Sequence, residues 1–183
     1  YKAELAVLKK HLDAGGFCAI GEIGMDLYWD KTFVEEQKDA FRIQIHWAKE
    51  NGLPIAIHCR DAFDEIFEIL EDEKDELLRG VFHCFTGTLE QAHRAIDLNF
   101  YLGIGGVVTF KKSGLDAVVK DIDLKYLILE TDSPYLAPSP NRGKRNESSY
   151  LIHIAQKLAD LHQVPIESLA KITTDNSVKL FGC

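Results

Sequence analysis

Apolar runs of strand length alternate along the chain with stretches in which apolar residues recur at helical spacing. The runs that predict strands cover residues 17–24, 53–59, 80–85, 100–108 and 125–132. Helices are predicted over residues 1–14, 32–50, 62–71, from 88 onward, over 115–121 and 147–162, and after Pro165. Near-continuous apolar strands alternating with helices predict a parallel sheet covered by helices. No linker interrupts this rhythm, so we expect residues 1–183 to form a single domain.

Two helices carry a start signal in the sequence. Thr32 with Glu35, and Thr88 with Gln91, have the spacing of a capping box, in which two side chains satisfy free backbone amides at the helix start. We therefore expect capping boxes to open helices at Thr32 and at Thr88.

Two architectures fit the alternation of strands and helices. One is an open, doubly wound sheet, and the other is a (β/α)8 barrel. A closed barrel needs eight strands and typically ~250 residues. The chain has 183 residues and five predicted strands, so the strand count alone favours the open sheet.

Composition is that of a globular protein, with 46% hydrophobic residues and a net charge of -8. This charge has the wrong sign for the broad basic surface that marks many nucleic-acid-binding proteins. No apolar stretch approaches the ~20 residues of a membrane span, and no signal-peptide pattern opens the chain. We therefore expect a cytoplasmic protein that does not associate with membranes. The four cysteines form no C-x-x-C motif, and we expect no disulfides.

Four of the five predicted strands end in a residue that can bind a divalent metal, namely Glu22, His58, His83 and Asp132. The fifth ends in glycines, which leave room for a close approach. Because the carboxyl ends of parallel strands meet on one face, these side chains should converge. Carboxylates gathered in a cavity need a positive partner to offset their desolvation, and mixed carboxylate and imidazole donors suit Zn, Mn or Fe. The sequence therefore predicts a divalent-metal site.

Strand alternation predicts which way the side chains of neighbouring residues point. Cys59 and Cys84 should point away from the site and serve in packing. Glu130 lies two residues before Asp132, so it should share the inward face and tune a ligand or a water, the alternative being a buried acid paired with a lysine. The other histidines lie in helical stretches and are interpreted as surface or packing residues: His11, His46, His93, His153 and His162.

Six motifs together carry a family resemblance: GEIGMDLY, IHCRDAF, VFHCFTG, GIGGVVTFK, LILETDSPYL and RGKRNES. In this order, over nearly the whole chain, they resemble the TatD family of metal-dependent deoxyribonucleases, in the amidohydrolase-like TIM-barrel superfamily. The resemblance implies a (β/α)8 TIM barrel. It also implies a first strand with an H-x-H pair, which residues 1–183 do not contain. We therefore expect this chain to lack the first strands of the barrel.

The resemblance also implies roles for the strand-end residues. Glu22 would bridge two divalent ions, Mg, Mn or Zn, and His58 and His83 would hold one of them. Asp132 would join the H-x-H pair at the other ion and orient or deprotonate the attacking water. With Glu130 beside them, Glu22 and Asp132 make up the expected catalytic set.

Residues in loops beyond the strand ends would, by the same resemblance, meet phosphates and sugar or base edges of the substrate. They are Tyr28, Arg60, Lys111, Arg145 and Asn146. A basic loop and two bound ions can make a cleft positive while the outer surface stays negative, so the acidic total is compatible with a nucleic-acid substrate.

The expected function is hydrolysis of DNA phosphodiester bonds, as a 3′→5′ exonuclease on single strands. Two alternatives remain open at this point. One is a small-molecule amidohydrolase or lactonase with the same metals, and the other is a non-catalytic metal-binding scaffold, because the H-x-H pair is absent. Five strands leave sheet edges unpaired, so we expect residues 1–183 alone to aggregate or to pair with another chain.

Overall fold

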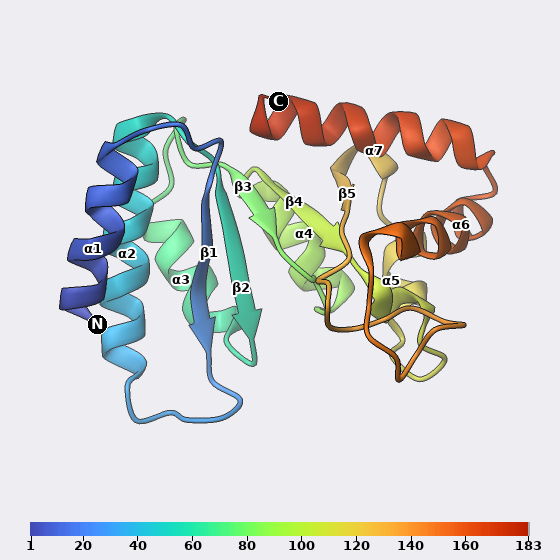
Figure 1. Ribbon diagram of the computed structural model, residues 1–183, viewed down its shortest axis with the longest axis horizontal. Coiled ribbons are helices and arrows are strands. Elements are labelled where there is room, and N and C mark those ends of the chain that lie inside the picture. Colours follow the sequence, from blue (N-terminus) through green and yellow to red (C-terminus); the bar gives the residue numbers. More distant parts are fainter. Residues whose placement is uncertain (183) are drawn as a thin grey trace.

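The strands of the computed structural model, which describes residues 1–182, pair in the order in which they occur along the chain, and every neighbouring pair is parallel (Figure 1). In a doubly wound sheet the strand order reverses at a switch point, whereas in a barrel each strand lies beside the next. The observed order therefore excludes the open sheet that the strand count favours and fits an arc of a (β/α)8 barrel. The strands are β1 (Ile20–Asp26), β2 (Ile55–Arg60), β3 (Gly80–Phe82), β4 (Phe100–Ile104) and β5 (Leu127–Leu129).

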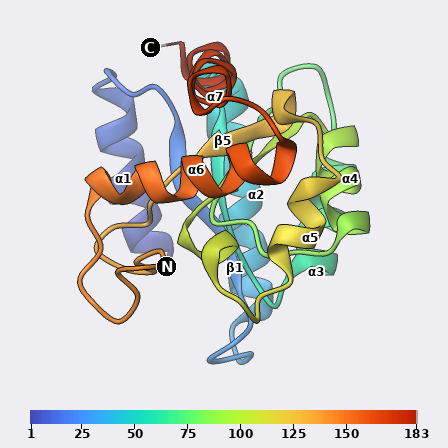
Figure 2. The ribbon, with the colours of Figure 1, turned by 90° about the vertical axis from the view of Figure 1, so that its right-hand side faces the viewer.

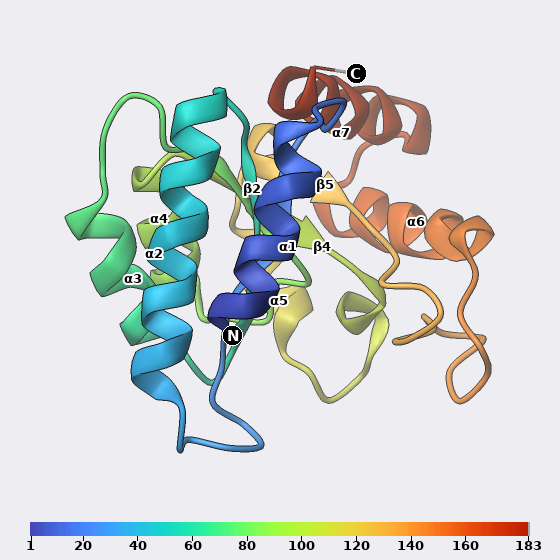
Figure 3. The ribbon, with the colours of Figure 1, turned by 60° about the vertical axis from the view of Figure 1, so that its left-hand side comes forward.

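Helices follow the strands and pack along the sheet. Helices α1 and α2 lie side by side next to β1 (Figures 1 and 3), whereas α6 and α7 lie on the side of β5 (Figure 2). Among the described residues, no helix combines the length and apolar character that a membrane span requires. The α-helices are α1 (Lys2–Asp13), α2 (Val34–Asn51), α3 (Phe63–Asp72), α4 (Leu89–Asp97), α5 (Leu115–Lys120), α6 (Leu151–His162) and α7 (Ile166–Phe181). Three 3-10 helices are η1 (Gly106–Thr109), η2 (Leu124–Tyr126) and η3 (Ser148–Tyr150).

Strand ends differ from those predicted. Strand β1 continues past Glu22 to Asp26, because the alternation of buried Ile23 and Met25 with more exposed neighbours continues beyond the polar residue. Glu22 thus lies within its strand and not at the end of it. Strands β3 and β5 are short and end before His83 and Asp132, which follow them in loops.

Alternation sorts the strand residues onto two faces. One face packs against helices and forms the main core, which includes the aromatic side chains of Phe63, Phe67, Phe82, Phe85 and Phe100. The other face carries Ala56, Val81, Tyr101 and Ile128, packed with Leu180 and Phe181 of α7. Two residues further along, this second face reaches His58, His83, Gly103 and Glu130. The candidate site residues thus lie on one face of the sheet, on the carboxyl side of the apolar residues of that face.

A buried amide attaches α7 to the sheet. Asn176 is 8% exposed, and its Nδ2 donates hydrogen bonds to the carbonyl oxygens of Leu124 (2.9 Å) and Leu127 (2.8 Å). Because an unpaired buried carbonyl costs free energy, one side chain satisfies two groups at the amino end of β5. This contact lies at the opposite end of the strand from Asp132.

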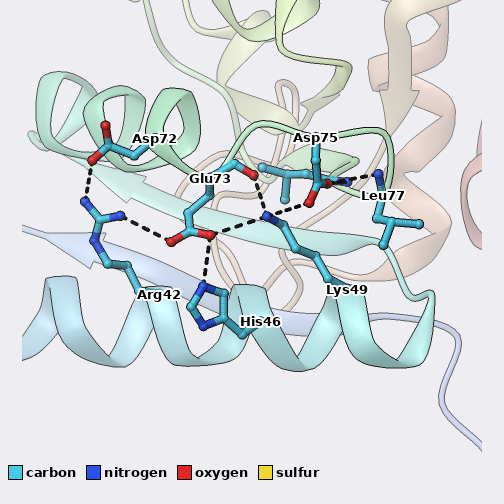
Figure 4. Close-up of polar contacts among 8 residues, drawn as sticks. Arg42, His46, Lys49, Asp72, Glu73, Asp75 and Leu77 are labelled. Atoms are coloured by element: carbon cyan, nitrogen blue, oxygen red, sulfur yellow. Dashed lines mark hydrogen bonds and ion pairs between the residues drawn. The ribbon is translucent and has the colours of Figure 1, made fainter.

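An ion-pair cluster joins α2 to the end of α3 (Figure 4). Glu73 receives contacts from Arg42 (3.3 Å), His46 (2.9 Å) and Lys49 (3.3 Å), which lie on one side of α2. Asp72 and Asp75 extend the cluster through Arg42 and Lys49. The cluster positions the loop that leads into β3, on the outside of the sheet.

Only one of the two predicted capping boxes forms. At Thr88 both halves are present: Thr88 Oγ1 accepts from the Gln91 amide (3.2 Å), and Gln91 Oε1 accepts from the Thr88 amide (2.9 Å). The prediction at Thr32 is wrong, since α2 begins at Val34 and its first turn has no side-chain cap. The Thr32 amide instead donates to Asp30 Oδ1 (2.8 Å), in a turn before the helix.

Thr88→Ala and Thr32→Ala make the same chemical change at two positions that look alike in the sequence. Thr88→Ala should lower the free energy of unfolding by about 1 kcal/mol and Tm by roughly 2–4 °C, because it removes an N-cap. Thr32→Ala should change stability by less than about 0.5 kcal/mol. Urea and thermal unfolding compare the two. Equal losses would contradict the assigned helix start.

Candidate metal centre

Three side chains from different strands converge on one point. Glu22, His83 and Asp132 each offer a donor atom, and these atoms lie within 4.8 Å of one another. Glu22 is on β1 and Asp132 follows β5, which are the two edge strands of the sheet. Across a flat sheet, four strand spacings of ~4.8 Å would separate these strands by ~19 Å. The convergence therefore requires a strongly curved sheet, as in a barrel wall.

The carboxylate of Glu22 lies between two imidazoles. Its Oε1 is 3.6 Å from His83 Nε2, and its Oε2 is 3.9 Å from His58 Nδ1. Asp132 Oδ1 is 3.7 Å from the same His83 Nε2. These separations are too long for hydrogen bonds. They are close to the ~3–3.5 Å that separates neighbouring donors when each lies ~2.1 Å from one ion. The donor set therefore fits a shared divalent cation.

Each histidine also contacts a second carboxylate through its other ring nitrogen. His83 Nδ1 is 2.6 Å from Glu130 Oε2, and His58 Nε2 is 3.2 Å from Asp26 Oδ2. Histidines that bind metals usually have this arrangement, in which the outer carboxylate fixes the ring and leaves the inner nitrogen free to bind.

The sequence reasoning missed Asp26. Its position four residues after Glu22 places it on the same strand face by alternation, a signal that becomes visible once β1 is extended past Glu22. The pairing of Glu130 with His83 corresponds to the expected role beside a ligand. Among the described residues, no lysine pairs with Glu130, which was the alternative.

The glycines that end β4 make room for Glu130. A Cβ atom at Gly103 would lie 3.1 Å from Glu130 Oε2, and one at Gly105 would lie 3.1 Å from Oε1. The close approach expected at these glycines is thus made by this carboxylate. Glu130 Oε1 is buried and has no hydrogen-bond partner among the described residues. A negative group held this way adds to the demand for positive charge nearby.

The pKa shifts within the cluster also favour a bound cation. The hydrogen bond that His83 donates to Glu130 raises the pKa of His83, against the lowering effect of burial. Burial raises the pKa of Asp132, and the nearby carboxylates of Glu130 and Glu22 add to the rise. Glu22, His83 and Asp132 border a cleft of about 520 Å³ in which Arg60 is the one lysine or arginine among the described lining residues. A cation at the cluster would offset this crowding of acids.

Cys59 and Cys84, which each follow a histidine, differ in where their side chains lie. Cys59 packs against the main core as expected, and burial raises the pKa of its thiol to about 12. The expectation that Cys84 points away is wrong. Strand β3 ends at Phe82, and Cys84 has a left-handed φ of 45°, so alternation no longer holds and its thiol lies beside Glu130. Burial also raises the pKa of the Cys84 thiol, which keeps it protonated and a poor ligand.

The expected substrate residues fall into three groups. Tyr28 and Arg60 lie together, with Arg60 Cζ 3.8 Å from the centre of the Tyr28 ring. Lys111 and Arg145 are exposed in loops and do not line the cleft. Asn146 is 2% exposed, and its Nδ2 donates to the carbonyl oxygens of Thr131 and Tyr135, both at 2.6 Å. Its amide thus holds the loop after Asp132 and is not directed at a substrate.

Two basic loops contact each other. Arg142 Cζ lies 4.1 Å from the centre of the Phe110 ring, and the Ser139 amide donates to Thr109 Oγ1 (2.9 Å). These contacts bring the loop that contains Lys144 and Arg145 next to the loop that contains Lys111 and Lys112. We call this set of four residues the basic rim.

Comparison with known proteins gives close relatives. The sequence model described as "TatD related DNase" matches residues 2–182. The chain is 48% identical over 164 residues to the uncharacterized metal-dependent hydrolase YabD of Bacillus subtilis, covering 89% of this chain and 64% of the relative. It is 38% identical over 170 residues to a protein of Escherichia fergusonii named 3'-5' ssDNA/RNA exonuclease TatD, covering 90% of this chain and 65% of the relative.

The fold has a close structural counterpart. The crystal structure of YJJV, a TatD homologue from Escherichia coli, superposes with a TM-score of 0.93 at 29% identity, covering 100% of this chain and 71% of that one. Three of the most similar curated relatives are matched over 62–64% of their own length. The match of the family's sequence model to residues 2–182 shows that the chain belongs to the TatD-related DNase family.

Proposed function

We propose that this protein is a divalent-metal-dependent hydrolase that cleaves phosphodiester bonds in DNA, from the 3′ end of single strands. The observation that carries the proposal is the cluster of Glu22, His83 and Asp132, with donor atoms spaced as around a shared cation. The names of the relatives support it: YabD is named a metal-dependent hydrolase, and the Escherichia fergusonii protein an exonuclease on single-stranded DNA and RNA.

The ligands are assigned to Glu22, His58, His83 and Asp132, with Glu22 shared by two ions of Mg, Mn or Zn in a complete site. Bound divalent ions supply a water of lowered pKa and positive charge beside the scissile phosphate. Glu22 presents one carboxylate oxygen toward each histidine, and its donor atom also lies within 4.8 Å of that of Asp132, so Glu22 is close to the residues proposed for both ions. Glu130 and Asp26 hold the two imidazole rings in the orientation that binding requires.

Asp132 is the proposed base. Its Oδ1 faces the cluster, where it can orient an attacking water and accept its proton. Burial raises the pKa of Asp132 in the metal-free cluster. The new bond forms between the water oxygen and phosphorus while the bond from phosphorus to the leaving sugar oxygen breaks. The basic rim of Lys111, Lys112, Lys144 and Arg145 is proposed to attract the remaining phosphates of the strand.

Removal of His83 tests the function. His83→Ala, in protein expressed from the complete gene, should lower nucleotide release from 3′-labelled single-stranded DNA at least ~100-fold, because it removes a ligand. Metal content by elemental analysis should fall in parallel. His93→Ala is the matched control, since His93 is exposed on α4, away from the cluster. Hydrolysis of lactones or amides in place of DNA by the parent protein would contradict the nuclease assignment.

Replacement of Glu130 tests its role beside His83. The hydrogen bond that His83 donates to Glu130 raises the folded-state pKa of His83 above its usual ~6.5. The pair therefore stabilises the metal-free protein fully below that value, and the stabilisation is lost as pH rises through the folded-state pKa. Glu130→Gln should thus destabilise metal-free protein more at pH 5.5 than at pH 9, in urea unfolding with a chelator present.

The control for Glu130→Gln is Glu76→Gln. Glu76 is exposed and makes no ion pair among the described residues, so its replacement should change stability little at either pH. Histidine titration by NMR should also show the pKa of His83 falling in Glu130→Gln. A loss of stability that is independent of pH would contradict the assigned pairing.

A further inference from the structure

We propose that Tyr28, Trp29 and Arg60 form a stacking platform that binds a base of a single-stranded nucleic acid beside the metal centre. The inference rests on the proposed function and names a binding site within it. Trp29 is the new residue, since the motifs that point to metal chemistry do not include it.

The platform lies at the carboxyl ends of the strands, as the metal cluster does. Tyr28 and Trp29 come after β1, separated from it by Leu27, and Arg60 ends β2, in register with Asp26. The carboxylate of Asp26 joins the two sites: its Oδ2 contacts His58 Nε2 at 3.2 Å, and its Oδ1 accepts from the Tyr28 amide at 3.0 Å. One side chain thus positions both a candidate ligand and the start of the platform.

The rings of Tyr28 and Trp29 both lie next to the guanidinium of Arg60. Its Cζ lies 3.8 Å from the centre of the Tyr28 ring and 5.4 Å from that of Trp29. The two rings meet edge to face, with centroids 4.7 Å apart at 89°. Cation–aromatic contacts of this kind hold rings in place while their outer faces stay open.

The rings are exposed to solvent. Trp29 is 78% exposed and Tyr28 is 52% exposed. A single exposed aromatic residue needs no explanation. Here, however, the exposed indole lies beside Arg60, which lines the cleft of the metal cluster. A third exposed aromatic residue, Tyr135 (70%), lines the same cleft. Aromatic rings and cationic groups along a cleft are the features with which proteins bind single strands.

Charge and geometry favour a single strand over other occupants. Bases in a duplex are stacked on one another and cannot lie on an indole, whereas each base of a single strand has a free face. Arg60 can in addition attract the phosphate next to the stacked base, in a protein whose net charge of -8 would otherwise repel nucleic acid. The geometry therefore points to one base on Trp29 with its phosphate near Arg60.

The chain offers a direct optical test, because it contains only two tryptophans, Trp29 and Trp47. Trp47→Phe leaves Trp29 as the one tryptophan of residues 1–183. In this variant, with a chelator to prevent cleavage, a short oligothymidylate should quench the fluorescence saturably. An abasic strand of the same length, which has phosphates but no bases, should not. No quenching by oligothymidylate would overturn the platform.

The binding affinities of variants distinguish base stacking from attraction between charges. Trp29→Ala should weaken binding of oligothymidylate about 5- to 100-fold, because stacking on one aromatic ring is lost. Its affinity for the abasic strand should not change, and Trp29→Phe should recover part of the loss. Phe33→Ala, which removes another exposed aromatic side chain (56% exposed), is the control and should bind oligothymidylate as the parent does. Equal affinity of Trp29→Ala and parent would also overturn the proposal.

A small substrate distinguishes this proposal from the proposed function. Bis(p-nitrophenyl) phosphate has a scissile diester but no strand to position, so Trp29→Ala should hydrolyse it with manganese at the parent rate while KM for single-stranded DNA rises. A parent protein that hydrolyses neither substrate but binds oligothymidylate through Trp29 would refute the nuclease function and support the platform. Hydrolysis of DNA with unchanged KM in Trp29→Ala would refute the platform and support the nuclease.

Discussion

Negative charge concentrated on one face of a curved parallel sheet is the constraint on which the rest of the structure depends. Glu22, Asp26, Glu130 and Asp132 all approach two histidines there, and burial raises the pKa of Asp132. A cluster of this kind is costly unless something positive joins it. The main core packs against helices on the other face, and the apolar residues of this face lie toward the amino ends of the strands. Glu22 and Asp132 therefore border a cleft in which Arg60 is the one lysine or arginine among the described lining residues.

Each imidazole is fixed from behind by a carboxylate, and this pairing explains residue choices further away. Glu130 lies beside His83 where Gly103 and Gly105 leave room, since a Cβ atom at either glycine would lie 3.1 Å from one of its carboxylate oxygens. Asp26 can reach His58 because β1 extends two pairs beyond Gly24 in register with β2. The histidines at the ends of two apolar runs are therefore one part of a set that also includes glycines and acids on neighbouring strands.

Much of this fold follows from local patterns in the sequence, and the failures have physical causes. Strands and helices were predictable because burial alternates with period two or recurs at helical spacing. The strand order was not, since it depends on pairing between distant segments, and neither were the contacts of Asn176 with β5 or of Glu73 with α2. Thr32 and Thr88 look alike in sequence, but a competing turn at Asp30 decides that only Thr88 caps a helix. Asp26 lies two residues beyond Gly24, where the predicted run ends, and Cys84 breaks the expected alternation because its backbone leaves the strand geometry.

The two edge strands of the sheet each contribute to the same cluster, Glu22 through β1 and Asp132 through the loop after β5. A cation shared by these side chains would link β1 to the loop after β5 and stabilise the curvature of the sheet between them. Ligands that bind only the folded state add their binding free energy to its stability. Occupancy of the site and closure of the wall would then be coupled, so that the chemistry and the shape of the protein depend on the same few oxygen and nitrogen atoms.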